Sequence, residues 1–81
     1  MLLDLLSVNA ALMAKGYGVR LDQYGSVVVH RGGHVRGGWR SVLGVLEWTP
    51  AGYYVALFKV ADVDAAVWHT LVALGLNGDK D

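Results

Sequence analysis

One short segment carries most of the side chains that are suited to binding another molecule. Residues 30–40 hold three arginines, two histidines and a tryptophan, separated by little more than glycine. A guanidinium group presents a planar fork of donors to phosphate or carboxylate, and an indole ring offers a face for stacking. The segment therefore predicts binding of an anionic partner rather than catalysis.

Three interpretations of this segment remain open. Its repeated Arg-Gly-Gly resembles the RGG segments of nucleic-acid-binding proteins, in which a flexible backbone lets guanidinium groups follow phosphates. The formal net charge of zero favours an acidic protein surface instead, because nucleic-acid-binding domains are typically basic. The third interpretation is a glycine-rich hairpin connection whose arginines are simply solvated.

Charge is distributed unevenly along the chain. Residues 15–40 hold five basic residues against one acidic residue, whereas residues 41–81 hold two basic residues against five acidic ones. A polarised molecule of this kind can steer a charged partner without any net charge. We expect a partner-binding surface formed by seven residues: Arg20, Tyr24, Arg31, His34, Arg36, Trp39 and Arg40.

Metal binding and catalysis find little support in the sequence. His30 and His34 are four residues apart, but the glycines between them exclude the helix that would aim both rings at one metal ion. The chain has no cysteine, no nucleophile elbow and no phosphate-binding loop, and the glycine pairs lack the spacing of a dinucleotide motif. We therefore expect no metal, no cofactor and no enzymatic activity.

The composition is that of a small folded domain. Hydrophobic residues make up 54% of the chain, against a usual share of about 45–50%, and only 17% are charged, so disorder is not expected. Residues 1–81 are long enough for one domain but too few to hide every apolar side chain, which favours a homo-oligomer or an obligate complex.

The sequence gives no sign of a membrane partner or of export. It contains no apolar stretch near the ~18 residues of a membrane span, and its apolar first residues lack the positive charges of a secretory signal. The absence of cysteine also fits a reducing compartment. We expect a cytoplasmic protein.

Two segments have the periodicity and the end signals of helices. Residues 2–15 place apolar side chains at helical spacing, and Gly16 follows where a helix C-terminal cap belongs. A second helix is expected over residues 63–74, with Asp62 as its N-cap. Gly75 and Asn77-Gly78 are expected to end it, and residues 76–81 to form a frayed tail.

The middle of the chain predicts strands. Residues 17–22 and 27–30 read as a hairpin, four glycines in 31–38 argue against regular structure there, and 39–48 read as a third strand. A turn at 49–52 then leads into a fourth strand over 53–60, which leaves Tyr53 or Tyr54 outside the core. The expected fold is α+β, in the order α-β-β-β-β-α: a four-stranded antiparallel meander with two helices packed on one face.

A very small, cysteine-free α+β domain without catalytic motifs resembles the inhibitors encoded by phages and mobile elements, anti-CRISPR proteins among them. That resemblance implies a protein that covers a surface of a larger complex. We therefore expect a non-enzymatic interaction module with a protein partner. The alternatives are a nucleic-acid-binding module and a self-assembling subunit whose first helix buries Leu3 and Ala10 against its twin.

Overall fold

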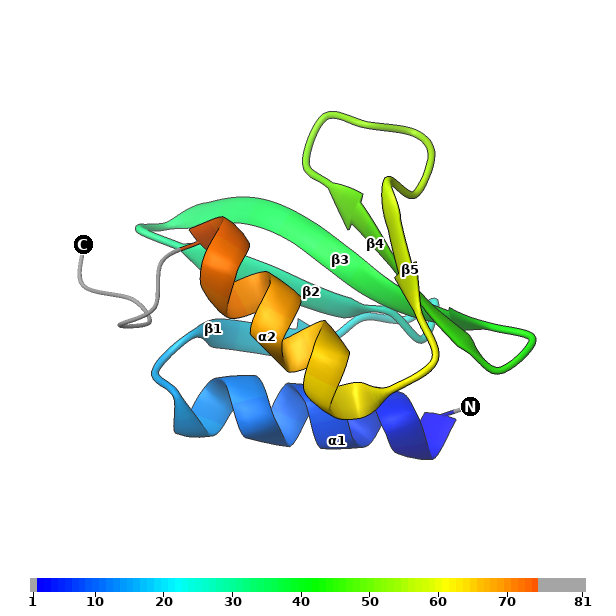
Figure 1. The fold of residues 1–81 in the computed structure, drawn as a ribbon. Coiled ribbons are helices and arrows are strands. Elements are labelled where there is room, and N and C mark those ends of the chain that lie inside the picture. Colours follow the sequence, from blue (N-terminus) through cyan, green and yellow to red (C-terminus); the bar gives the residue numbers. More distant parts are fainter. Residues whose placement is uncertain (1, 75–81) are drawn as a thin grey trace.

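The computed structural model describes residues 2–74, which form two helices and one five-stranded antiparallel sheet (Figure 1). The strands follow one another across the sheet in chain order, as a meander. The elements are α1 (Leu2–Ala14), β1 (Gly18–Leu21), β2 (Val27–Arg31), β3 (His34–Val42), β4 (Val45–Pro50), β5 (Phe58–Val60) and α2 (Val63–Leu74).

Both predicted helices are confirmed, and each ends or begins on a recognisable cap. At the end of α1, Gly16 adopts a φ of 94°, and the Tyr17 N–H donates to the Leu12 carbonyl at 3.1 Å, which is the hydrogen bond that closes a Schellman motif. At the start of α2, a carboxylate oxygen of Asp62 accepts the Ala65 N–H at 3.0 Å. The predicted stop at Gly75 and Asn77-Gly78 and the tail at 76–81 lie outside the described residues.

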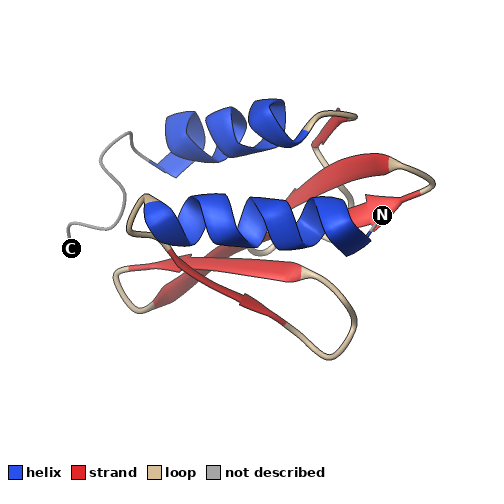
Figure 2. Cartoon of the chain, turned by 90° about the horizontal axis from the view of Figure 1, so that it is seen from below, coloured by secondary structure: helices blue, strands red, loops and turns tan. Residues whose placement is uncertain are grey.

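The two helices run side by side and contact each other (Figure 2). Neither helix within residues 2–74 is long and apolar enough to cross a membrane.

The sheet has five strands, so the prediction of four was wrong. The expected third strand over 39–48 is divided by a tight turn at Leu43 and Gly44, whose φ angles are 52° and 82°. Two successive positive φ values are the geometry of the two-residue turn that best matches the twist of a hairpin. Leucine rarely adopts a positive φ, so Leu43 does not signal a turn. The sequence of residues 39–48 therefore reads as one uninterrupted strand.

The glycine-rich segment is regular, contrary to the prediction. Gly32 and Gly33 have φ angles of 61° and 80° and form a second two-residue turn, and β3 begins directly after it at His34. The second glycine pair, Gly37 and Gly38, lies inside β3. Glycine therefore has two different roles here: one pair closes a hairpin, and the other is part of its strand.

The expected fourth strand over 53–60 is mostly loop. Strand β4 continues to Pro50, the Tyr53 N–H donates to the Pro50 carbonyl at 3.1 Å, and only Phe58–Val60 pair with β4. Both Tyr53 and Tyr54 are exposed, rather than one of them.

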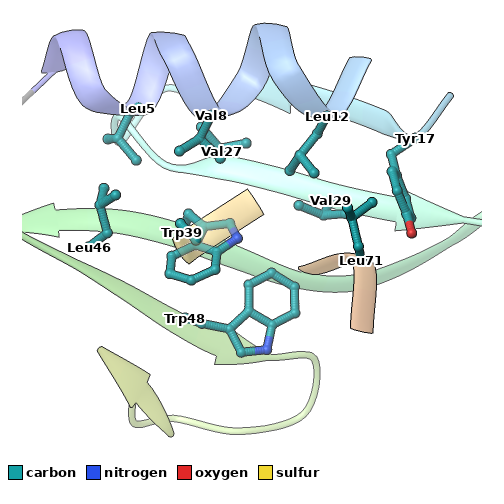
Figure 3. Packing of buried hydrophobic residues seen from close by; sticks show 11 residues of the cluster. Leu5, Val8, Leu12, Tyr17, Val27, Val29, Trp39, Leu46, Trp48 and Leu71 are labelled. Atoms are coloured by element: carbon teal, nitrogen blue, oxygen red, sulfur yellow. The ribbon is translucent and has the colours of Figure 1, made fainter. Parts of the chain in front are cut away.

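The core is centred on Trp39, which is fully buried (Figure 3). Its indole N–H donates to the Thr70 hydroxyl of α2 at 2.9 Å, and its ring centroid lies 5.3 Å from that of Trp48. The buried apolar residues come from both helices, the sheet and the α1–β1 connection: Leu5, Val8, Leu12, Tyr17, Val27, Val29, Trp39, Leu46, Trp48, Ala66 and Leu71.

Trp48 fixes the identity of a glycine on the neighbouring strand. A Cβ at Gly37 would lie 2.6 Å from two ring carbons of Trp48 and 2.8 Å from the Thr49 carbonyl oxygen. Real side chains do not approach so closely, so any larger residue at position 37 would displace the indole ring or the backbone of β4.

His69 of α2 closes the aromatic cluster. Its ring stacks on Phe58 with centroids 3.8 Å apart and planes at 4°, and it meets Trp39 and Trp48 edge to face. Burial lowers the pKa of His69 below its usual value of 6.5, because the charged imidazolium loses hydration there.

We predict that Gly37→Ala lowers the free energy of unfolding by about 1–3 kcal/mol, as expected for overpacking of a filled core. Urea unfolding followed by tryptophan fluorescence measures the loss. The matched control is Gly38→Ala, since a Cβ there meets no atom closer than the Val27 carbonyl oxygen at 3.5 Å. Equal stability of Gly37→Ala and wild type would mean that Trp48 moves aside at no cost.

We also predict that stability falls as the pH drops through about 6.5. Below that pH the unfolded chain takes up a proton on His69 that the folded chain resists, so acid favours unfolding. Urea unfolding at pH 7.5, 6.5 and 5.5 should show a steeper loss for wild type than for His69→Phe, which keeps a ring on Phe58 but does not titrate. The same pH slope in both proteins would contradict this assignment.

Candidate binding surface on the outer face of the sheet

The side chains of a strand alternate between the two faces of its sheet, so the buried residues identify the opposite face. Val27, Val29 and Trp39 point into the core, and their neighbours Val28, Gly38 and Arg40 therefore point the other way. We call this side the outer face. It is defined by Arg20, Val28, Gly38, Arg40 and Thr49.

One row of residues crosses the outer face over four strands. Arg20 of β1 pairs with Val28 of β2, Val28 with Gly38 of β3, and Gly38 with Thr49 of β4. Directly paired residues lie on the same face of a sheet, with their Cβ atoms about 4.5–5.5 Å apart. The row is therefore continuous. Between Val28 and Thr49 the row contains Gly38, which has no side chain.

A shallow hollow of about 320 Å³ lies over three residues of this row. Val28, Gly38 and Thr49 line it together with Arg40 and the loop residues Tyr53 and Tyr54. The β1–β2 turn borders it as well, through Asp22 and Ser26.

The β4–β5 loop supplies exposed aromatic rings beside the hollow. It stands away from the rest of the sheet (Figure 1), and Tyr54 is fully exposed while Tyr53 is 56% exposed. Val55 and Leu57 of the same loop are also exposed. Exposed apolar side chains gathered in one segment are typical of a surface that contacts a partner.

The charges on the outer face leave its arginines available. Glu47 forms an ion pair with Lys59 at 3.8 Å, and a carboxylate oxygen of Asp22 accepts the N–H groups of Tyr24 and Ser26 at 2.9 Å each. Arg20 and Arg40 are exposed, and neither forms an ion pair with a carboxylate within residues 2–74. Glu47 pairs with Arg40 in the strand register, but its ion pair is with Lys59, and Arg20 and Arg40 face solvent.

The β2–β3 hairpin holds three of the predicted contact residues at the end of the sheet. His34 and Arg36 are exposed, and Arg31 is half-buried. A β-bulge separates this end from the outer-face row, because Val29 pairs with Gly37 while His30 pairs with Val35, which leaves Arg36 without a partner on β2. Arg31 and Arg36 line a second hollow of about 290 Å³ with Ala73 and Leu74 of α2.

The predicted contact residues therefore divide into three groups. Arg20 and Arg40 lie on the outer face, and Tyr24, which is 81% exposed, lies in the turn that borders the hollow. Arg31, His34 and Arg36 lie on the hairpin. The seventh residue requires a correction: Trp39 is fully buried in the core, so the prediction that its ring faces a partner was wrong.

Sequence reasoning did not single out five of the residues that line the hollow. Val28, Gly38 and Thr49 come together only through strand register, which residue types alone do not reveal. Tyr53 and Tyr54 carried a usable signal, because they follow Pro50-Ala51-Gly52, a sequence typical of a turn, and a loop there would expose both rings. Because a strand was expected over residues 53–60, the exposure of both rings was not predicted.

The side chains of this surface are suited to recognition. Guanidinium donors bind carboxylates or phosphates, and tyrosine rings give a large contact area at a low cost in conformational entropy. Within residues 2–74, no three histidine, aspartate or glutamate side chains gather closely enough to hold a metal ion together.

Comparison of the chain with protein-family models, with curated proteins and with solved structures gives no match. The functional argument therefore depends on the chain's own surface.

Proposed function

We propose that this protein is a non-enzymatic interaction module that binds an acidic segment of a protein partner on the outer face of its sheet. One observation carries the proposal: Arg20 and Arg40 are exposed and have no ion-pair partner within residues 2–74, beside a hollow that Tyr53 and Tyr54 border. Arginine and tyrosine are the residue types most enriched, with tryptophan, at the energetic centres of protein interfaces.

The proposal takes both helices to pack on the face opposite to the hollow. Leu12 of α1 and Leu71 of α2 belong to the same core cluster as Val27 and Trp39, whose side chains point away from the outer face. The outer face is then the broad side of the sheet that a partner can reach. A cytoplasmic inhibitor from a phage or mobile element, which covers a surface on a larger complex, is one form that such a module takes.

The proposed contact surface differs from the one expected from sequence. It keeps Arg20, Tyr24 and Arg40, adds Tyr53 and Tyr54, and has no role for Trp39. The hairpin residues extend it only where a partner is long enough to reach the end of the sheet. Exposed apolar residues on the helices, Trp68 and Val72 among them, leave self-association as an additional property of the same molecule.

We predict that Arg40→Gln reduces recovery of the partner by about tenfold, the equivalent of one charge-assisted hydrogen-bonded contact. The measurement is affinity capture from the native host with quantitative mass spectrometry. Lys15→Gln is the matched control, because it removes one exposed positive charge at the end of α1. Both variants should keep the wild-type Tm, and equal recovery by Arg40→Gln and wild type would refute the outer face as the contact surface.

Nucleic acid is a distinct outcome of the same experiment. Phosphate binding weakens steeply with salt, with a log–log slope of about −0.7 for each phosphate contacted on a single strand. A labelled 20-nucleotide single strand that binds with such a slope, together with loss of capture after nuclease treatment, would replace the protein partner with nucleic acid.

A further inference from the structure

Gly38 occupies a position that the fold itself does not reserve for glycine. It lies inside β3, paired on one side with Val28 and on the other with Thr49. A glycine within a strand weakens it, because the residue loses more conformational freedom on folding and has no side chain to pack. The presence of glycine inside this strand therefore calls for a structural or functional explanation.

The structure explains the other glycines within residues 2–74. Gly18 and Gly37 would each place a Cβ within 2.7 Å of a neighbouring side chain. The rest have positive φ: Gly16, Gly25, Gly32, Gly33, Gly44 and Gly52. Gly38 does not have a positive φ, and among residues 2–74 its Cβ would meet only the Val27 carbonyl oxygen at 3.5 Å, an ordinary contact distance. Alanine therefore fits at position 38 against the described part of the chain.

Gly38 is also part of the lining of the outer-face hollow. A side chain at this position would project from the outer face, between Val28 and Thr49. Because neighbouring strands are about 4.8 Å apart, these two flanking side chains are separated by roughly 10 Å, with bare backbone between them. That gap is a slot between a valine and a threonine side chain.

We infer that the slot at Gly38 receives an aromatic side chain of the partner, next to an acidic residue that pairs with Arg40. This inference depends on the function proposed above and specifies which side chains the partner presents. A flat ring can lie against a glycine backbone, and the side chains of Val28 and Thr49 flank it on either side. Arg40 is two residues along the same strand, about 7 Å away, so a carboxylate adjacent to the ring in the partner's sequence reaches it.

The first test measures stability and needs no partner. Gly38→Ala should raise Tm by about 2–8 °C, because alanine loses less conformational freedom on folding and meets no clash. Gly37→Ala, at the adjacent position on the other face, should lower Tm. A lower Tm for Gly38→Ala would show that the fold requires this glycine, and it would overturn the inference.

The second test measures occupancy of the slot. The probe is the peptide acetyl-Glu-Trp-Glu-amide, titrated to millimolar concentration while amide shifts are followed by NMR. In wild type it should shift the amides of Gly38, Val28 and Thr49, and acetyl-Glu-Ala-Glu-amide and acetyl-Lys-Trp-Lys-amide should have little effect. Gly38→Ala, verified as folded by the same spectra, should bind the probe at least fivefold more weakly. The absence of shifts at Gly38, or equal binding by Gly38→Ala, would overturn the slot.

The two proposals fail in different ways. If Arg40→Gln loses the captured partner while Gly38→Ala retains it, the slot is refuted and the contact surface stands. If both variants retain the partner, the outer face itself is refuted.

Discussion

A buried indole needs an acceptor for its N–H, and this requirement connects the sheet to α2. Trp39 donates to the Thr70 hydroxyl, and Thr70 in turn donates to the Ala66 carbonyl one helical turn earlier. A buried N–H without an acceptor costs about 1–3 kcal/mol. The register of α2 over β3 is therefore set by a directional contact, in addition to the apolar packing around it. Trp48 and His69 then pack against the ring whose position this hydrogen bond fixes.

The two faces of β3 show how a single strand serves both the core and the surface. Gly37 is bare because Trp48 lies over it, so the chain's own core occupies that space. Gly38 is bare on the opposite face, where the space above it is a hollow. The bulge at Arg36 lies between these two glycines and the β2–β3 turn, and it shifts the alternation of side chains there.

The helices were predictable because their signals are local. Gly16 and Asp62 mark ends through hydrogen bonds to residues only a few positions away, and both act as expected. The β2–β3 and β3–β4 turns were not predictable in the same way. The first was obscured because four glycines argue against regular structure, and the second because Leu43 adopts a backbone conformation that leucine seldom takes.

The candidate surface was predictable in part. Arg20 was expected on the solvent face of its strand because alternation is visible in the sequence, and it is exposed. Arg40 was expected as part of the arginine-rich and glycine-rich segment, and it is exposed as well. Trp39 was misplaced because its neighbours in sequence are glycine and arginine, whereas its buried contacts come from distant residues, among them Thr70, which is 31 residues away. Gly38 gained its meaning only from comparison with the other glycines in three dimensions.

The lengths of the outermost strands have a consequence for behaviour at high concentration. The two edge strands of the sheet, β1 and β5, have only four and three residues. An edge strand presents unpaired N–H and C=O groups that can pair with a strand of another chain. A short edge strand offers few such groups. A chain that is 54% hydrophobic therefore presents few unpaired backbone groups at the edges of its sheet for another chain to pair with.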